Sequence, residues 1–450
     1  MLTTEADPLV NDLVRDAERI LDANWKDGFT IPTAKLYPFQ WNWDSGFTSL
    51  GHSYFRLDYA MRELDSLFSG QWANGMVPHI IFHSETEETY FPNHDFWGSH
   101  VNAGAPQRPK TSGITQPAVH GFVLETLLAK YPDDEDLVAF AKHLFPKIVH
   151  SHRFFYTHRD PEREGLTFIF HPWESGRDNS PLWDTSMDRI EIKPGMLPEY
   201  HRRDTSLAPS EERPTSYQYD RYVYLLLLGK KHKYDEAGIF DESPFVVQDT
   251  LMNAVLIRSN ESLIALGKRF GLDVGEVEEW QQQAVPRFRE KLWNDDLQTF
   301  TAYDVRGDEP IAHHEIGGLT ALYAGVPSTE QAQRLNAYLQ NLHARGHYLC
   351  PSFDVDSPLF DSKRYWRGPI WSQMNWLIYF GLKRYGFLDT AGLVRGDLIE
   401  LVSTLGFYEY FEPQKAVAAT LSAGYGGGAF SWTAACTLDL LHEQVLNEHV

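Results

Sequence analysis

The chain has 450 residues, 42% of them hydrophobic, and a formal net charge of −22. This length supports a large hydrophobic core, and the acidity argues against binding to nucleic acid or to an anionic membrane, because both select clustered Lys and Arg. The longest apolar runs, such as residues 222–228, are far shorter than the roughly 20 residues that cross a bilayer.

Hydrophobic residues recur at three- and four-residue spacing along the chain, which predicts amphipathic helices. Strict alternation is rare, and 167–170 and 299–303 are the expected short strands. No low-complexity tract or linker divides the sequence, so we expect one all-α domain over residues 1–450. The clearest helical stretches are 61–68, 123–128, 264–270, 335–342 and 393–405.

The segments between these helices are unusually rich in Trp, Tyr, Gly, Asp and Asn. Any single Trp is better explained as a wedge between helices. Together, loops gathered at one end of a helical scaffold would form an aromatic-walled pocket, and aromatic faces stack on the C–H faces of sugar rings. The loops are expected at 36–46, 71–79, 171–184, 365–371 and 407–432.

Residues 173–181, Trp-Glu-Ser-Gly-Arg-Asp-Asn-Ser-Pro, are the first candidate for sugar chemistry. Glycoside hydrolysis needs two carboxyl groups, one to protonate the leaving oxygen and one to activate water or attack, and their pKa values must differ. Glu174 and Asp178 are the acids here. Alternatively, Asp178 or Asn179 caps a helix that has Pro181 in its first turn.

Glu409 is the second candidate, because it stands among aromatic residues. The glycines of 424–428 follow it and let the backbone approach a ligand closely. A helix C-terminus followed by a mobile surface loop explains this stretch equally well.

Two further patterns suit a sugar site. Trp41-Asn42-Trp43-Asp44 could form a subsite in which Asp44 accepts two hydroxyl groups, or it could be a half-buried helix start. Arg221 carries a guanidinium that matches a carboxylate in bidentate geometry, although a local ion pair explains it as well.

Other chemistries lack support. The His313-His314-Glu315 side chains diverge on a helix, and His79 and His83 are not part of an HExxH motif, so we expect no catalytic metal. GxSxG, strand-linked GxGxxG and GxxxxGK[ST] motifs do not occur, which argues against serine hydrolases and nucleotide-binding proteins. With two cysteines, no CxxC spacing and a polar, acidic N-terminus, the sequence predicts a cytoplasmic protein.

Several segments resemble glycoside hydrolase family 63. Residues 173–184 match its acid-bearing segment, Trp-Glu-Ser-Gly-x-Asp-Asn-Ser-Pro-x-Trp-Asp. Residues 365–371 match its Tyr-x-Arg-Gly-Pro-x-Trp segment, and 409–413 with 430–435 resemble its base-bearing segment. The resemblance is greatest to the bacterial mannosylglycerate and glucosylglycerate hydrolases, through residues 36–44, 71–79, 111–117 and 219–222.

The resemblance implies an (α/α)6 barrel, an inverting mechanism and no cofactor. It maps the general acid to Asp178, with Glu174 in support, and the general base to Glu409. Arg221 maps to the position that would hold a glycerate carboxylate. The residues that map to the sugar-holding site are Tyr37, Trp41, Trp43, Asp44, Gln116, Trp173, Tyr365, Trp366 and Trp371.

One segment departs from the family pattern. Related hydrolases continue from the base into Pro-x-Thr-Gly-x-x-x-Gly, whereas 412–428 is longer and lacks that Thr-Gly. We expect this loop to border the leaving-group site.

The sequence thus predicts an inverting α-glycosidase that releases a hexose and glycerate from 2-O-α-mannosylglycerate, 2-O-α-glucosylglycerate or both. An α-glucosidase or α-mannosidase acting on a neutral disaccharide is the alternative within this class. Two more distant alternatives are a sugar epimerase, which would need paired histidines, and a non-catalytic sugar-binding toroid. The choice between gluco and manno substrates, and between a monomer and a homo-oligomer, is left open.

Overall fold

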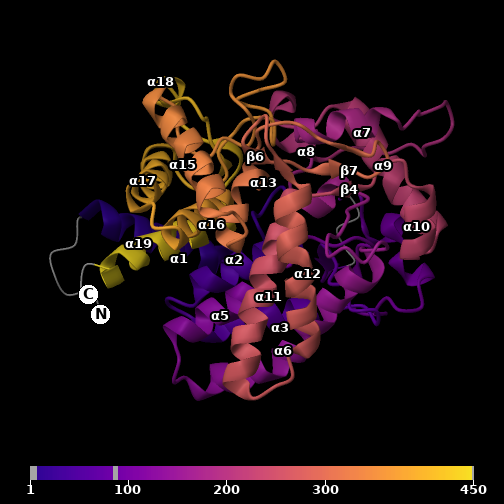
Figure 1. Cartoon of the computed structure of the whole chain (residues 1–450), viewed down its shortest axis with the longest axis horizontal. Coiled ribbons are helices and arrows are strands. Elements are labelled where there is room, and N and C mark those ends of the chain that lie inside the picture. The colour runs from indigo at the N-terminus through magenta and orange to yellow at the C-terminus, as the bar shows by residue number, and fades with distance from the viewer. Residues whose placement is uncertain (1–7, 85–89, 448–450) are drawn as a thin grey trace.

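The computed structural model describes residues 8–84 and 90–447, and most of this part of the chain is helical (Figure 1). Local sequence sets where many helices begin. At the start of α11 (Thr250–Phe270), the Asp249 carboxylate accepts a hydrogen bond from the Met252 N–H group. Such a cap gives a partner to an N–H group that has none within the helix.

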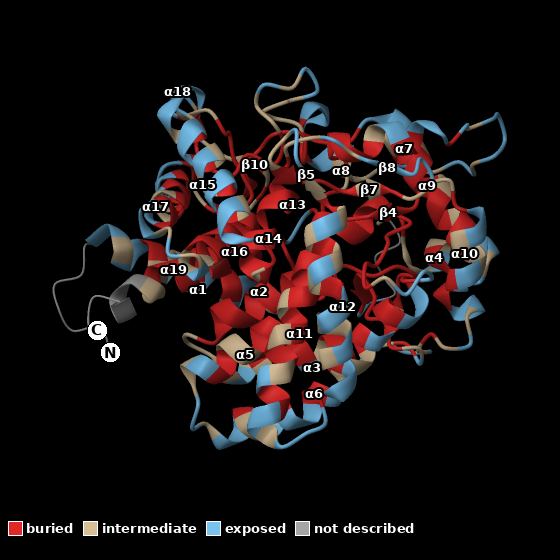
Figure 2. Ribbon diagram, viewed as in Figure 1, coloured by how far each residue is buried: buried red, intermediate tan, exposed pale blue. Residues whose placement is uncertain are grey.

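A closed cycle of contacts connects the most deeply buried helices, because each contacts the next and the last contacts the first. Every residue of α2 is buried, so other elements surround this helix on all sides. Figure 2 shows this burial as red ribbon through the middle of the molecule. In order, the cycle contains α2 (Asn42–His52), α5 (His120–Lys130), α11, α14 (Ala321–Ala324), α16 (Ser372–Arg384) and α19 (Ser431–Asn447).

A second set of helices packs on the outside of this cycle. They bury one stripe each, as α15 does with Ala332, Leu335, Leu339 and Leu342. In Figure 1, α1 and α19 lie side by side, and they contact each other. The outer helices are α1 (Pro8–Asn24), α3 (Leu57–Phe68), α6 (Glu135–His158), α12 (Gly275–Lys291), α15 (Thr329–Ala344) and α17 (Leu388–Leu405).

The remaining elements lie in the connections. Their strands are two to four residues long and pair antiparallel. The helices are α4 (His94–Trp97), α7 (Asp184–Asp188), α8 (Asp204–Leu207), α9 (Ser216–Lys231), α10 (Glu236–Glu242), α13 (Ile316–Leu319) and α18 (Lys415–Ala418), with short 3-10 turns η1 (Ser99–Val101), η2 (Pro172–Ser175), η3 (Pro181–Trp183) and η4 (Ser210–Glu212).

The strands form four small sheets with the orders β1-β2-β3, β4-β7-β8, β5-β6 and β10-β9. Their bounds are β1 (Gln40–Trp41), β2 (Ile80–Phe82), β3 (Lys110–Thr111), β4 (Val247–Gln248), β5 (Trp293–Asn294), β6 (Thr299–Phe300), β7 (Tyr303–Asp304), β8 (Glu309–Pro310), β9 (Tyr408–Tyr410) and β10 (Tyr425–Gly428).

The five predicted helical stretches are confirmed, since they lie within α3, α5, α11, α15 and α17. Other local expectations were met only in part, with strands at both ends of 299–303. The segment expected as a loop at 36–46 becomes α2 from Asn42 onward, and 407–432 contains β9, α18 and β10. The 167–170 segment forms only a bridge between Ile169 and Val247. In the described ranges, no helix is both long enough and apolar enough to cross a membrane.

Candidate active site

A pocket of about 910 Å³, its open mouth included, lies near the N-terminal ends of four of the cycle helices, α2, α5, α16 and α19. Residues in the first turns of α2 and α19 line it, together with residues that precede α5 and α16. The predicted site residues that line it are Tyr37, Trp41, Trp43, Asp44, Gln116, Trp173, Asp178, Tyr365, Trp366 and Glu409.

Asp178 lies in the connection between η2 and η3. Before it, Gly176 has φ +68°, and a Cβ there would come within 2.6 Å of the Trp43 ring, so the loop packs directly on the aromatic wall. The Tyr222 hydroxyl donates to the Asp178 carbonyl at 2.8 Å. The following turn is capped by Ser180 rather than by Asp178 or Asn179, which leaves the Asp178 carboxyl in the pocket.

Burial raises the pKa of Asp178 to about 7. Arg213 opposes this rise, and the negative charge of Glu409 adds to it. Desolvation disfavours the carboxylate anion, so Asp178 holds a proton near neutral pH. That protonation state suits a group that must donate a proton.

Glu409 lies in the middle of β9 and is 1% exposed. Its Oε1 accepts a hydrogen bond from the Tyr37 hydroxyl at 2.9 Å, and its Oε2 accepts one from the Gly427 N–H group at 3.1 Å. The Arg213 Nη1 atom is 3.6 Å from Oε2. Burial raises the pKa of Glu409, and Arg213 and the hydrogen bonds oppose that rise because each favours the ionised form.

The loop that departs from the family pattern holds this carboxylate. Its strand β10 pairs with β9, and Gly426 has φ +71°. A Cβ at Gly426 would collide with the Glu409 carboxylate and the Tyr410 ring. This loop therefore supports Glu409 through Gly427 and does not itself line the pocket, and the predicted leaving-group border stays a prediction.

Tryptophans dominate the pocket walls. Trp366 lies parallel to Trp371, with ring centroids 3.8 Å apart. Trp366 faces the pocket, whereas Trp371 lies behind it and is fully buried. The expectation that Trp371 touches the sugar therefore does not fit its position: it occupies the N-cap position of α16, without a side-chain cap, and stacks against Trp366 from the core side.

Asp44 occupies the first turn of α2 and points a third carboxyl into the pocket. Burial raises its pKa well above the ordinary value, and the nearby Glu409, Glu63 and Asp178 charges add to this. The N–H group of its neighbour Trp43 donates to the Gln116 side-chain oxygen at 3.3 Å, which links α2 to the segment before α5. Polar groups thus stand at the rim of the aromatic wall, as sugar hydroxyls require.

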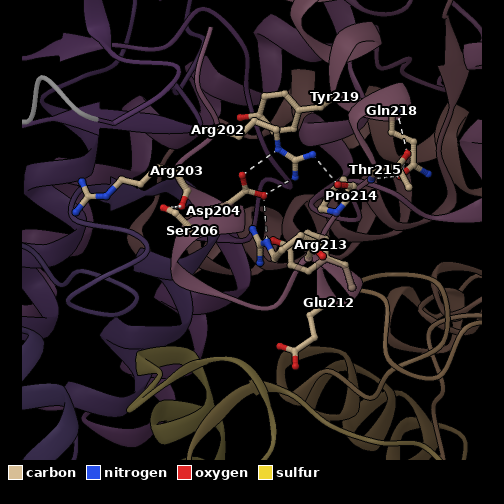
Figure 3. Close-up of polar contacts among 12 residues, drawn as sticks. Arg202, Arg203, Asp204, Ser206, Glu212, Arg213, Pro214, Thr215, Gln218 and Tyr219 are labelled. Atoms are coloured by element: carbon tan, nitrogen blue, oxygen red, sulfur yellow. Dashed lines mark hydrogen bonds and ion pairs between the residues drawn. The ribbon is translucent and has the colours of Figure 1, made fainter.

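Sequence reasoning missed the basic groups of the pocket. Arg203, Asp204 and Arg213 line it, from the connection between α7 and α9. In Figure 3, Asp204 lies between the guanidinium groups of Arg202 and Arg213, and Arg203 extends away from this cluster. Two charged runs, 202–204 and 211–213, are the signal that could have found them in so acidic a chain.

Arg213 reaches several pocket groups at once. Its Nη2 donates to the Tyr37 hydroxyl at 2.8 Å, its Nε lies 3.3 Å from Asp204, and its guanidinium stands over the Tyr365 ring. Its Nη1 is buried and makes no hydrogen bond within the described residues. The charged group that it faces is the Glu409 carboxylate.

Arg221 does not line this pocket, which corrects the expected position of the carboxylate-binding residue. On α9, Tyr219 and Tyr222 are three residues apart and face the pocket and the Asp178 loop. Arg221 points elsewhere: its guanidinium lies 3.4 Å over the Tyr217 ring and donates to the carbonyls of Met187 and Tyr217. It lines a separate surface hollow.

Glu174 lies beneath the pocket and is fully buried. The two Arg159 Nη atoms donate to its carboxylate at 2.8 and 3.0 Å, and the Phe170 N–H group donates to it at 2.9 Å. Its role in the structure is to hold the loop rather than to face the pocket. Among the residues that the structure describes, no group of three or more His, Cys, Asp or Glu side chains could hold a metal ion.

A mostly helical scaffold that presents two carboxyls between tryptophan walls defines a glycoside hydrolase. The comparisons agree: the model of the mannosylglycerate hydrolase MGH1-like glycoside hydrolase domain matches residues 37–433. The chain therefore belongs to this family, within glycoside hydrolase family 63, and the resemblance seen in the sequence is confirmed.

Individual relatives match over almost their full length. The mannosylglycerate hydrolase of Rubrobacter radiotolerans is 38% identical over 97% of this chain and 98% of its own. The glucosylglycerate hydrolase of Mycolicibacterium hassiacum is 32% identical over 95% and 97%. A crystal structure of the family 63 mannosylglycerate hydrolase from Thermus thermophilus, in complex with Tris and D-glycerate, superimposes with a TM-score of 0.88 at 40% identity, covering 95% of this chain and 99% of that one.

Proposed function

We propose that this glycosidase hydrolyses 2-O-α-mannosylglycerate, 2-O-α-glucosylglycerate or both, with inversion at the anomeric carbon. Asp178 donates a proton to the leaving glycerate oxygen, and Glu409 takes a proton from the attacking water. The observation that carries the proposal is that Asp178 and Glu409, 231 positions apart in the chain, line one pocket in different surroundings.

Those surroundings divide the two roles. Asp178 keeps its proton because its carboxyl is buried, with a pKa near 7. Glu409 instead accepts hydrogen bonds from Tyr37 and Gly427 and faces Arg213. Groups that stabilise the anion suit a general base, and a neutral carboxyl suits a general acid.

The leaving group is anionic, and the pocket supplies cations for it. Arg213 offers Nη1, and Arg203 lines the same pocket. A guanidinium binds a carboxylate through parallel hydrogen bonds, which favours glycerate over a neutral aglycone. The names and the D-glycerate complex of the relatives support the same substrate class.

We also propose that the cycle of α2, α5, α11, α14, α16 and α19 is the inner ring of an (α/α)6 barrel, and that the chain forms one catalytic domain. Six inner helices that contact in sequence and six that pack outside them support this arrangement. The expected compartment stays the cytoplasm, and the free, buried state of Cys350 and Cys436 fits a reducing environment.

The test is to incubate the protein with mannosylglycerate, glucosylglycerate and neutral α-disaccharides and to follow the released anomer by NMR. We expect mannosylglycerate and glucosylglycerate to release the β-anomer of the hexose as the first product. Asp178→Ala and Glu409→Ala should each lower kcat by about a hundred- to ten-thousand-fold. Initial release of the α-anomer, wild-type kcat in either variant, or equal turnover of neutral disaccharides contradicts the corresponding part of the proposal.

A further inference from the structure

The residue just before Asp178 occupies the position that the family 63 acid motif leaves open, and in this chain it is Arg177. Its side chain is completely buried and does not line the pocket. A buried guanidinium is costly unless carboxylates pair with it and accept its hydrogen bonds. The surroundings of Arg177 therefore indicate why this position carries a charge.

Two buried carboxylates hold the guanidinium from different helices. Nη1 bonds the Glu315 carboxylate, and Nη2 bonds the Asp249 carboxylate. Both acids also cap a helix: Asp249 accepts the Met252 N–H group at the start of α11, and Glu315 accepts the Gly317 N–H group at the start of the short connecting helix α13. The starts of α11 and α13 thus fix the position of the Arg177 guanidinium group.

Glu315 ends the His-His-Glu run whose side chains the sequence predicted to diverge. In the structure its second oxygen accepts the Thr250 hydroxyl at 2.7 Å, so both oxygens face α11 and Arg177. A carboxylate restrained through both oxygens gives the guanidinium a rigid partner. This group of Arg177, Asp249 and Glu315 is called the arginine clamp below.

The arginine clamp acts on Asp178 through the backbone. The Arg177 carbonyl accepts the Trp183 indole N–H at 2.7 Å and the Ser180 N–H at 3.1 Å, and the next carbonyl, that of Asp178, accepts the Tyr222 hydroxyl. Because the Arg177 side chain is also anchored, residues 177 and 178 are held both through their backbone carbonyls and through this side chain. The direction in which the Asp178 carboxyl enters the pocket is fixed as a result.

We propose that Arg177, held by Asp249 and Glu315, is a positioning residue that aims the Asp178 carboxyl at the leaving oxygen. This inference rests on the proposed function, in which Asp178 is the general acid. Misplacing a catalytic group by about 1 Å costs on the order of a hundredfold in rate. The loss should appear only in the step that needs proton donation, and substrate binding should change little.

The experiment compares two leaving groups, because fluoride departs without a proton from the enzyme whereas the glycerate oxygen requires one. Asp249→Asn, Glu315→Gln, Arg177→Lys and Arg177→Met are assayed on mannosylglycerate, or glucosylglycerate if that is the better substrate, and on the matching α-glycosyl fluoride. For the two carboxylate variants we expect kcat on the glycerate substrate to fall about ten- to a hundredfold, with KM and fluoride turnover within about threefold of wild type. Arg177→Lys keeps the positive charge but loses the paired N–H donors of the guanidinium, so it should behave like the two carboxylate variants.

Asp439→Asn is the matched control. Asp439 is a buried acid that pairs with Lys130 and accepts the Trp376 indole N–H, and neither it nor these partners line the pocket. The Asp439→Asn substitution should lower thermal stability and should change the turnover of the glycerate and fluoride substrates by the same factor. If Arg177→Met does not fold, the carboxylate variants carry the test, because they keep the guanidinium paired with its other partner.

The outcomes separate this inference from the proposed function. Asp178→Ala should lose the glycerate reaction and keep fluoride turnover; if it loses both equally, the assignment of Asp178 as the acid fails. A second result would contradict only the positioning role of Arg177. In it, Asp178→Ala loses glycerate turnover and keeps fluoride turnover, whereas the arginine clamp variants either lose turnover of both substrates equally or keep wild-type rates.

Discussion

Replacing Arg213 with methionine removes a positive charge that lies 3.6 Å from the Glu409 carboxylate. At an effective dielectric constant of about 20, unit charges at that distance attract by about 4–5 kcal/mol, or roughly three pKa units. Relaxation and water reduce this, so a rise of about one to three units is expected for Glu409. Arg213 also lowers the pKa of Asp178, so the pKa of Asp178 should rise too, by less.

The sign of the effect follows from the two roles. The base must be ionised, so a higher pKa at Glu409 moves the acid limb of the pH–kcat/KM profile to higher pH. The acid must be protonated, so the alkaline limb, near pH 7 in the wild type, also moves up. The whole bell therefore shifts toward alkaline pH, and its height falls because Arg213 contacts the pocket.

The assay is kcat/KM for the glycerate substrate between about pH 4 and pH 10, read as apparent values for the coupled pair. Arg221→Met is the control, since it also removes one positive charge, but from a residue of α9 that lies outside the pocket. The pH profile of this variant should not shift along the pH axis. Arg213→Lys should keep the position of the bell and lose height. An Arg213→Met profile that falls in height without moving refutes the electrostatic role of Arg213.

Four other substitutions test the site. Tyr37→Phe removes a hydrogen bond to Glu409, so the acid limb should move up by about half to one unit; an unmoved limb contradicts this. Gly426→Ala forces a Cβ against the Glu409 carboxylate at a positive φ, so kcat should fall at least tenfold and stability by about 1–2 kcal/mol, and unchanged kinetics would show that the base tolerates displacement. Trp366→Ala should act mainly on KM, whereas Trp371→Ala should cost about 3–5 kcal/mol in unfolding free energy; if denaturation and kinetics give the reverse, their assigned positions are wrong.

The parts of the site that lie in contiguous motifs could be predicted from the sequence. Asp178 and Glu409 each stand in a segment with a distinctive pattern, and both line the pocket. The helix periodicity likewise located α3, α5, α11, α15 and α17, because apolar residues at three- and four-residue spacing are visible in the sequence.

What could not be predicted depends on direction and on distant partners. Arg221 and Arg213 are equally plausible cations in the sequence, and only the rotation of α9, which turns Tyr219 and Tyr222 toward the site, separates them. Trp366 and Trp371 share one motif, yet one faces the pocket and the other the core. Glu315 acquires its partner from residue 177, and sequence spacing carries no information on such a contact.

Tyr37 and Glu409 are hydrogen-bonded although 372 positions separate them, and α19 closes the helix cycle on α2. During synthesis, Trp43 therefore lacks its contacts with Trp366 and Trp432 until the segments that carry those residues have been made. Contacts of such long sequence separation form late and slowly. A chain that has not reached residue 409 lacks the proposed general base, so hydrolytic activity should arise only after α19 has docked on α2.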